Sequence, residues 1–432
     1  MSQLLPAALA ERAQLNDEIH ARPPLPIAAE ECVLYLALLV DGAARIHERE
    51  LLLKLAGRHA VVLSEPLAAH LVFAPTADPQ WRLKYERHGE FSSWWLYRRG
   101  APNPPLRDAD LRPLLGDLAL AELPGQLLVA IEARVDSQHE RLTPAQAAAH
   151  FAGAHPIGSE IGGGAGRLYT DFRIDADGWT RLWIRNHGLG EGQCGRYLQR
   201  LLEIESYRMM ALRSLPVAQM LLPQLEAGEA ELAAIAQQLA AADGDVRDLD
   251  RQLLHRLSLL AGKVEGLIAA HGVRFTAAEA YGELVQRRLA ELREEPISGT
   301  QSLSEFMARR LTPALRTCEW TARRLHELSQ RIARQSQLLR TRVEIEQEQQ
   351  TQALLASMDR RAQLQLRLQE TVEGLSVVAI SYYGASVLGI ALRALKSRGV
   401  DLDPTLWTGL ALIPIALITA LGLRRLRRRL HG

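Results

Sequence analysis

Several short stretches of the sequence bring together side chains that could do chemistry, and the densest lies near the N-terminus. The stretch LNDEIHARPP combines carboxylates, an imidazole and a guanidinium within seven residues: Asn16, Asp17, Glu18, His20 and Arg22. Such a set could contact a metal ion or a phosphate group. The alternative is a capped turn, ended by two prolines and held to the main body by an ion pair.

Two further stretches are candidates of the same kind. The glycine-rich stretch HPIGSEIGGGAGR (155–167) lacks the Gly-Lys-Ser/Thr ending of a phosphate-binding loop and leads into a strand, which favours a mobile loop. In LLEIESYRM, Glu203 and Glu205 could form a pair of catalytic carboxylates. However, the spacing of Glu205 and Arg208 is that of a structural ion pair on one helix face.

Established catalytic signatures are missing from the sequence. There is no nucleophile elbow, zinc-protease motif or dinucleotide fingerprint. Trp94 and Trp95 are expected on opposite faces of one strand, which does not make a base-stacking platform. We therefore assign no catalytic residue and no cofactor. If the chain is an enzyme, the hypothesis is a hydrolase on a membrane anchor, and it rests on LNDEIHARPP alone.

Composition narrows the class of protein. The chain has 432 residues, and 51 Lys plus Arg balance 50 Asp plus Glu, so no overall charge attracts nucleic acid. Cys32, Cys194 and Cys318 are far apart, which gives neither a disulfide framework nor a zinc site and indicates a reducing compartment. The first residues do not have the basic and apolar regions of a cleavable signal peptide.

Two apolar runs lie near the C-terminus. Residues 374–392 and 404–423 are nineteen and twenty residues without a formal charge, and each as a helix would span about 30 Å, the thickness of a bilayer's hydrocarbon core. The alternative is a pair of buried helices in a soluble protein. Two such runs in succession, closed by an arginine cluster, favour a transmembrane hairpin.

Basic residues predict the orientation of this hairpin. Arg360, Arg361 and Arg367 precede the first span. The arginines that follow the second span are Arg424, Arg425, Arg427, Arg428 and Arg429. The connecting loop has fewer basic residues, so the positive-inside rule places both termini in the cytoplasm.

The first span contains polar and small residues that are unusual in a helix surrounded by lipid. Ser381, Ala385 and Gly389 recur every four residues, a spacing that lets another helix approach closely. Tyr383 lies at mid-span, where a phenol needs a hydrogen-bond partner or a watery cavity. The residues are therefore either helix-packing or pore-lining in an oligomer. The candidates are Ser376, Ser381, Tyr382, Tyr383, Gly384, Ala385 and Gly389.

A long helix is predicted before the first span. Ser302 and Glu305 form a capping box, and Pro313 implies a kink or a fresh start. No Gly or Pro follows until Gly374, so the helix would be about 120 Å long up to residue 392. Its apolar stripe requires a partner, either a second copy of the chain or the upstream helices. The stretch EQEQQTQ (346–352) has no apolar residue on any face.

The remaining sequence predicts an α+β protein with four regions. Strands are expected over residues 33–40, 70–75, 81–88, 92–99 and 127–135, a helix over 45–57, and a hairpin around the turn DADG. From Gly195 the pattern is helical, with three more helical runs after Pro216, the third opened by a capping box of Thr276 and Glu279. The expected regions are 1–188 (α/β domain), 189–300 (helical layer), 301–372 (stalk helix) and 373–432 (hairpin and basic tail).

Several of these stretches together resemble a bacterial family known as domain of unknown function 3422. They are LNDEIHARPP, TDFRIDADGWTR, GRYLQRLLEIESYRMMALRSLP, RFTAAEAY, FMARRLTPALRTCEW and QLRLQETVEGLSVVAISYYG. The resemblance extends from Leu15 to about Gly389 and implies a membrane anchor in the bacterial inner membrane. It implies no activity, so no catalytic residue is carried over.

The predicted architecture is also similar to that of CorA-type magnesium channels, pentamers whose first span lines the pore. Their Gly-Met-Asn signature is replaced here by ALRALKSRG (391–399), and basic residues at that position disfavour cations. The expectation is thus a homo-oligomeric membrane protein that contacts lipid and binds no nucleic acid. It is either an ion or solute conduit gated by its cytosolic domain, or a non-conducting scaffold or sensor with a ligand still to be identified.

Overall fold

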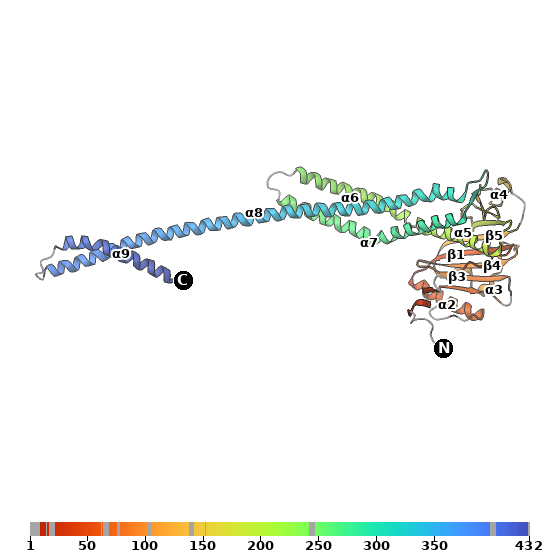
Figure 1. Cartoon of the computed structure of the whole chain (residues 1–432), viewed down its shortest axis with the longest axis horizontal. Helices are drawn as coiled ribbons and strands as arrows, with labels where there is room; N and C mark the ends of the chain where they lie inside the picture. The colour runs from red at the N-terminus through yellow and green to blue at the C-terminus, as the bar shows by residue number, and fades with distance from the viewer. Residues whose placement is uncertain are drawn as a thin grey trace. The chain divides into compact units, whose positions relative to one another are not determined.

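The computed structural model describes residues 9–13, 15–16, 22–61, 63, 69–75, 78–101, 105–137, 142–151, 153–241, 247–397 and 403–430. The chain divides into two compact units (Figure 1). The first comprises Met1–Ala242 and His255–Gln335, and the second comprises Asp243–Leu254 and Ser336–Gly432. Each is described by itself.

A mixed sheet forms the centre of the first unit, with nine strands among the described residues. Their order across the sheet is β2 (His70–Phe73), β3 (Trp81–Arg87), β4 (Phe91–Arg99), β1 (Glu31–Leu39), β5 (Gln126–Asp136), β8 (Thr180–Asn186), β7 (Gly166–Thr170), β6 (Ile157–Ile161) and β9 (Glu295–Pro296). Within this sheet β5 and β8 are parallel, and the other neighbours are antiparallel. The five strands expected before residue 136 are confirmed, each within two residues at either end.

Two hydrophobic cores lie on opposite faces of the sheet, because alternate residues of a strand point in opposite directions. One core contains Tyr35 and Trp95 and is closed by α5 (Glu191–Leu212), the end of α7 (Arg247–Leu292) and the start of α8 (Leu303–Lys396). The other contains Leu34 and Trp94 and is closed by α2 (Gly42–Arg58) and α3 (Arg112–Leu115). The adjacent tryptophans thus lie on opposite faces, as expected.

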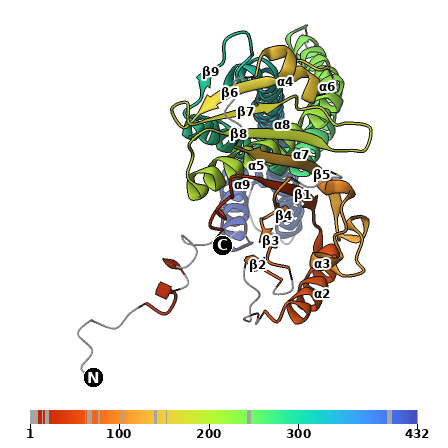
Figure 2. The ribbon, with the colours of Figure 1, turned by 90° about the vertical axis from the view of Figure 1, so that its right-hand side faces the viewer.

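A third, smaller core lies on the second of these faces. It contains Phe151, Tyr169 and Trp183, and it is covered by α4 (Pro144–His150). Figure 2 shows α4 beside β6 and β7, and α2 and α3 beside the other end of the sheet. Short 3-10 turns, η1 (Leu106–Asp108) and η2 (Leu120–Glu122), lie between β4 and β5 in the chain.

The predicted hairpin around DADG is confirmed as β7 and β8, which pair from Gly166 with Asn186 to Thr170 with Leu182. Gly178 has a φ of 89°, the left-handed conformation that glycine adopts without strain. Asp175 accepts hydrogen bonds from the backbone amides of Asp177 and Trp179, so it closes the turn from inside.

The helical part differs from expectation after α5. Instead of three runs there are two helices, α6 (Leu215–Ala241) and α7, and α7 continues through Thr276. The predicted capping box of Thr276 and Glu279 is therefore wrong: the Thr276 hydroxyl donates to the carbonyl of Gly272, 3.2 Å away, inside a helix. A threonine and a glutamate at this spacing satisfy the capping pattern but do not stop a helix whose neighbours favour helix.

The start of α8 agrees with the sequence. Ser302 Oγ accepts from the amide of Glu305 at 3.2 Å, as a cap does. Pro313 neither ends nor restarts the helix, which continues to Lys396. The first part of the apolar stripe, Leu325, Leu328 and Ile332, is buried within the first unit, and Leu328 lies against Gly228 of α6. Upstream helices therefore cover this part of the stripe.

The second unit contains the rest of α8 and α9 (Pro404–Leu430). Both helices are long and apolar enough to cross a membrane. Leu339 is fully buried, and the Arg342 guanidinium pairs with buried Asp250 at 3.0 Å. Beyond this point residues 347–356 of α8 are all exposed. The stretch EQEQQTQ lies in this uncovered part, except that its first residue, Glu346, is half-buried.

Candidate functional site

The residues of the LNDEIHARPP cluster are only partly placed. Asp17, Glu18 and His20 lie outside the described residues, and Asn16 is exposed. Arg22 is half-buried, and its Nη2 donates to the carbonyl of Arg87 on β3 at 3.2 Å. The structure therefore locates the end of the cluster against the sheet.

Residues 22–28, the N-terminal segment below, are held to the sheet and α5 by their backbone. The carbonyls of Arg22, Pro23 and Pro26 accept from Gln199, Lys84 and Arg82, at 3.4, 2.9 and 3.0 Å. The amide of Ile27 donates to the carbonyl of Glu191 at 3.0 Å. Side chains of β3 and α5 thus satisfy the carbonyls of the segment.

Lys84 of β3 lies beneath this segment with no exposed surface. Its ammonium is 2.8 Å from Glu86 Oε1, donates to Gln199 Oε1 at 3.2 Å and lies 4.9 Å from the Trp95 ring centroid. A buried ammonium is tolerated only when paired and hydrogen-bonded, and all three contacts meet that need. Lys84 is thus a structural cation at the junction of β3, α5 and the N-terminal segment.

The environment also changes the protonation of two neighbours. Burial raises the pKa of Glu86, and the ammonium of Lys84 opposes this effect. Burial, together with the charges of Arg22, Lys84 and Arg45, lowers the pKa of His88 from 6.5 to about 3. His88 is therefore neutral at ordinary pH, and its ring stacks on Phe91 with centroids 4.2 Å apart.

The two glutamates singled out on α5 have separate partners. Glu205 forms the expected ion pair with Arg208, whose Nε is 2.9 Å from Glu205 Oε2. Glu203 accepts from Gln199 and pairs with Arg288 of α7. Glu205 is therefore paired within α5, Glu203 links α5 to α7, and the arrangement offers no free pair of carboxylates at this position.

Sequence reasoning missed Lys84 and Glu86. The stretch WRLKYERH was interpreted as a strand, and a charged residue in an edge-type pattern is normally assigned to solvent. The local pattern gives no signal of their burial, because Arg82, Lys84 and Glu86 alternate with Trp81, Leu83 and Tyr85 as in a strand with one solvent-facing side. Only the chain segment that covers them makes their burial evident.

The glycine-rich stretch forms an ordered hairpin between β6 and β7. Gly162, Gly163 and Gly164 all have positive φ, from 64° to 84°, which a tight turn of this length requires. Arg167 pairs with Glu160 across the two strands. The stretch therefore forms two paired strands and a turn instead of the expected mobile loop, and it does not open a helix, in agreement with the rejection of a phosphate-binding loop.

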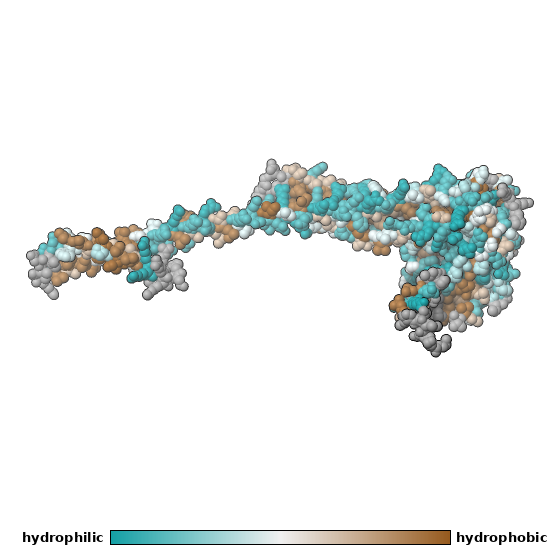
Figure 3. Space-filling model, viewed as in Figure 1, coloured by the Kyte–Doolittle hydropathy of each residue, from teal (hydrophilic) through white to brown (hydrophobic). Residues whose placement is uncertain are grey.

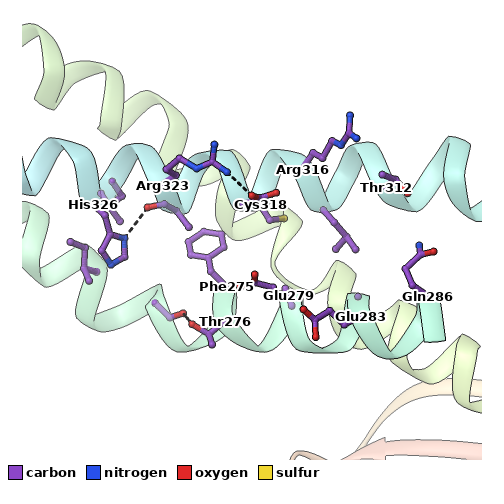
Figure 4. Close-up of a pocket in the computed structure, with 18 of the residues that line it drawn as sticks. Phe275, Thr276, Glu279, Glu283, Gln286, Thr312, Arg316, Cys318, Arg323 and His326 are labelled. Carbon is purple, nitrogen blue, oxygen red and sulfur yellow. Dashed lines mark hydrogen bonds and ion pairs between the residues drawn. The ribbon is translucent and has the colours of Figure 1, made fainter. Parts of the chain in front are cut away.

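A groove of about 990 Å³ lies between α7 and α8 in the first unit (Figure 4). Phe275, Cys318 and Leu325 form its buried floor, and Ser214 donates to Cys318 Sγ at 3.2 Å from beneath. Glu279 and Glu283 project from the α7 wall, while Arg316 and Arg323 project from the α8 wall (Figure 4). Arg287 also lies on the α7 wall and Glu319 on the α8 wall, so each wall carries charges of both signs.

The candidate residues of the first span are distributed over two faces of α8. Ser381, Ala385 and Gly389 are buried within the hairpin, and a Cβ on Gly384 or Gly389 would lie 3.2 Å from Ile415 or Thr408 of α9. Tyr382 and Tyr383 are 65% and 69% exposed, and Ser376 is half-buried with its hydroxyl bonded to the carbonyl of Val372. The small residues therefore face α9, and the tyrosines face outward.

Large apolar side chains cover the outside of the hairpin. Leu375, Val378, Val387 and Ile390 of α8 and Ile413 of α9 are each more than 60% exposed. Figure 3 shows this apolar surface along the α8–α9 hairpin. No group of three or more metal-ligating side chains was found in the part of the chain that the structure describes.

These features define a class of protein with a mixed-sheet region, long helices and a C-terminal pair of apolar helices. The family model described as protein of unknown function (DUF3422) matches residues 8–430, so the chain belongs to this family, as its motifs indicated. No curated protein and no solved structure matches the chain. The architectural similarity to CorA-type channels therefore has no support from these comparisons.

Proposed function

We propose that this protein is a membrane-anchored, self-associating scaffold or sensor of the bacterial inner membrane. The α8–α9 hairpin is its anchor, and the mixed-sheet region binds a ligand or partner in the cytoplasm. The observation that carries the proposal is the packing of the hairpin. Its small residues pack between α8 and α9, whereas its large apolar side chains point outward, where lipid would cover them.

Self-association is supported by the part of α8 between the covered stripe and the first span. Leu354, Leu355 and Met358 are 61%, 59% and 57% exposed, and a single helix cannot bury them by itself. In a membrane-anchored protein all copies point the same way, so the same stretch of each copy can meet in register. The simplest way to bury these side chains is a parallel bundle in which the same stretch of several copies packs together.

The experiment is fractionation of cells that express the full chain, followed by sizing in detergent. We expect the protein in the membrane fraction, resistant to carbonate extraction, and larger than a monomer after solubilisation. A reporter fused after Gly432 should respond as cytoplasmic. Recovery of a detergent-free soluble monomer, or a periplasmic response of the reporter, would reject the anchor.

Conduction is the second candidate function, and one observation favours it. Tyr382 and Tyr383 expose phenols at mid-span on the face away from α9, where a polar surface could line a passage between copies. Ion flux into liposomes that contain the oligomer distinguishes the candidates. The scaffold predicts a tight bilayer at all potentials, and a conduit predicts flux that a Tyr383→Phe variant changes.

A further inference from the structure

A cavity of about 450 Å³ lies on the sheet face that carries the α2–α3 core and the α4 core. The two cores contain residues of β1 to β5 and of β7 and β8, and between them this face carries the charged residues Glu132 and Arg134 of β5 and Arg181 of β8. Glu132 of β5 lies beside Arg181 of β8 in register, and Arg134 is two residues further along β5. This part of the face is therefore a charged cavity between two apolar cores.

Three arginines from separate elements line the cavity. Arg107 comes from η1, Arg134 from β5 and Arg181 from β8, and Glu132 is the carboxylate that lines it with them. Their chain positions are far apart, so only the fold brings them together. Glu132 lies 3.8 Å from Arg107 Nε and offsets part of the positive charge, and the planar guanidinium groups match the oxygens of carboxylate or phosphate.

Two of the arginines are held from behind by the DADG turn. Arg107 Nη1 lies 2.7 Å from Asp175 Oδ2, and Arg181 Nη2 lies 3.5 Å from the same oxygen. Arg181 also donates to the carbonyl of His150 at 3.2 Å. Asp175 therefore orients two guanidinium groups without itself lining the cavity.

Arg134 is less completely satisfied. Its Nε is buried and has no hydrogen-bond partner among the described residues, and the nearest carboxylate oxygen, of Asp136, is 3.6 Å away. That aspartate already accepts from Trp183 Nε1 at 2.7 Å and lies 3.6 Å from the guanidinium of Arg185. The Nε of Arg134 is thus not satisfied by a protein acceptor at hydrogen-bond distance in the described part of the chain.

The remaining lining is apolar or neutral. Leu106, Leu182 and Cys32 form apolar wall, and His150 lies at the edge with its ring stacked on Trp183. Burial and then the charges of Arg134 and Arg181 lower the pKa of His150, which is consistent with positive potential at this edge. The volume is that of a small-molecule site, and too small for a peptide helix.

We propose that this cavity binds a small molecule with an oxyanion, a phosphate or carboxylate group, through Arg107, Arg134 and Arg181. The inference rests on the ligand-binding role proposed above for the sheet region and gives that ligand a chemical class. The oxyanion would lie between the three guanidinium groups, and the rest of the ligand would contact Leu106 and Leu182. Glu132 would disfavour ligands with more than one oxyanion close together.

The test uses the full chain in detergent, with isothermal titration of inorganic phosphate and, separately, succinate at constant ionic strength set by chloride. We expect saturable binding of at least one of the two anions, and their comparison shows which oxyanion is preferred. The Arg134→Gln variant should bind the preferred anion at least tenfold more weakly. Arg112→Gln is the matched control, because Arg112 is a 73% exposed arginine outside the cavity. It should leave the affinity unchanged.

A second measurement on the wild-type protein guards against misfolding of the variant. Phenylglyoxal modifies accessible arginines, and the anion that binds, phosphate or succinate, should protect Arg134 and Arg181 but not the exposed Arg309. The proposal is overturned if neither anion binds, if Arg134→Gln binds like Arg112→Gln, or if protection is equal at Arg134 and Arg309. None of these measurements depends on membrane insertion or self-association, so failure here is distinct from failure of the anchor.

Discussion

Gly195 of α5 is the point at which the N-terminal segment comes closest to a helix. A Cβ placed on it would lie 2.0 Å from the carbonyl oxygen of Leu25, a backbone atom that cannot move without the segment. A glycine is required here because a larger side chain would not fit, and not because of the backbone conformation, which is that of an ordinary helix. It determines how closely the segment can cover Lys84.

We expect Gly195→Ala to lower the free energy of unfolding by about 1–3 kcal/mol, because the added methyl group overpacks a close contact. Urea denaturation followed by tryptophan fluorescence measures the change. Gly192→Ala, three residues earlier in α5, is the control, since the nearest atom to its Cβ is 3.8 Å away. It should be neutral or slightly stabilising, and an equal loss in both variants would contradict the contact.

His88 makes stability depend on pH. Its pKa is lowered in the folded protein from 6.5 to about 3, so the unfolded chain binds the extra proton between these values. The stabilisation is complete above pH 6.5 and is lost as pH falls toward 3. The slope that this one proton adds is at most about 1.4 kcal/mol per pH unit.

Urea denaturation at several pH values between 4 and 7 tests this expectation. The His88→Gln variant should show a shallower loss of stability toward acid than the wild type. His326→Gln, which changes an exposed histidine of α8, should retain the wild-type slope. Parallel curves for wild type and His88→Gln would show that other groups cause the acid dependence.

At the scale of elements, two similar sequence patterns have different outcomes in the helices. Ser302 precedes α8 and accepts from the amide of Glu305, whereas Thr276 lies in the middle of α7 and bonds to the carbonyl one turn earlier. The same pair of residue types thus caps one helix and is incidental in the other. Continuity of the helix before Thr276 decides the difference.

Alanine substitutions should separate the two positions. Ser302→Ala removes an acceptor for an otherwise unpaired helix amide, so we expect a loss of about 1 kcal/mol in the free energy of unfolding. Thr276→Ala should change it by less than about 0.5 kcal/mol, because alanine favours the helix interior. Urea denaturation measures both. A loss at Thr276 as large as that at Ser302 would restore a helix start at residue 276.

At the scale of the whole molecule, the apolar surface of the second unit determines the environment and the state of association in which the protein is stable. The hairpin exposes large apolar residues on both helices, and α8 exposes Leu354, Leu355 and Met358 before the first span. Water solvates neither surface well. Lipid would cover the first and a second copy the other.

Replacing Leu354, Leu355 and Met358 together by glutamine should therefore reduce self-association and leave membrane insertion intact. We expect the dissociation constant of the oligomer to rise at least tenfold, measured by mass photometry in detergent over a dilution series. The matched control replaces three exposed polar residues of the same helix, Gln349, Gln352 and Gln363, by alanine. An unchanged oligomer in the apolar variant would exclude this stretch from the interface.

The sequence by itself determined the strands, the DADG hairpin, the long α8 and the two apolar helices, because each depends on periodicity or turn chemistry within one stretch of chain. It also indicated the spacing of Ser381, Ala385 and Gly389, but it left their partner open. Which surface an element meets depends on distant residues, and α9 was one of several alternatives.

Only the tertiary structure decided which polar residues come together. Lys84 is buried because residues 22–28 cover it, and Arg107, Arg134 and Arg181 meet because β5 and β8 are parallel neighbours beside η1. Neither arrangement has a local signature, since the members are separated by tens of residues. Burial and charge density are properties of the packed chain, and a local pattern does not contain them.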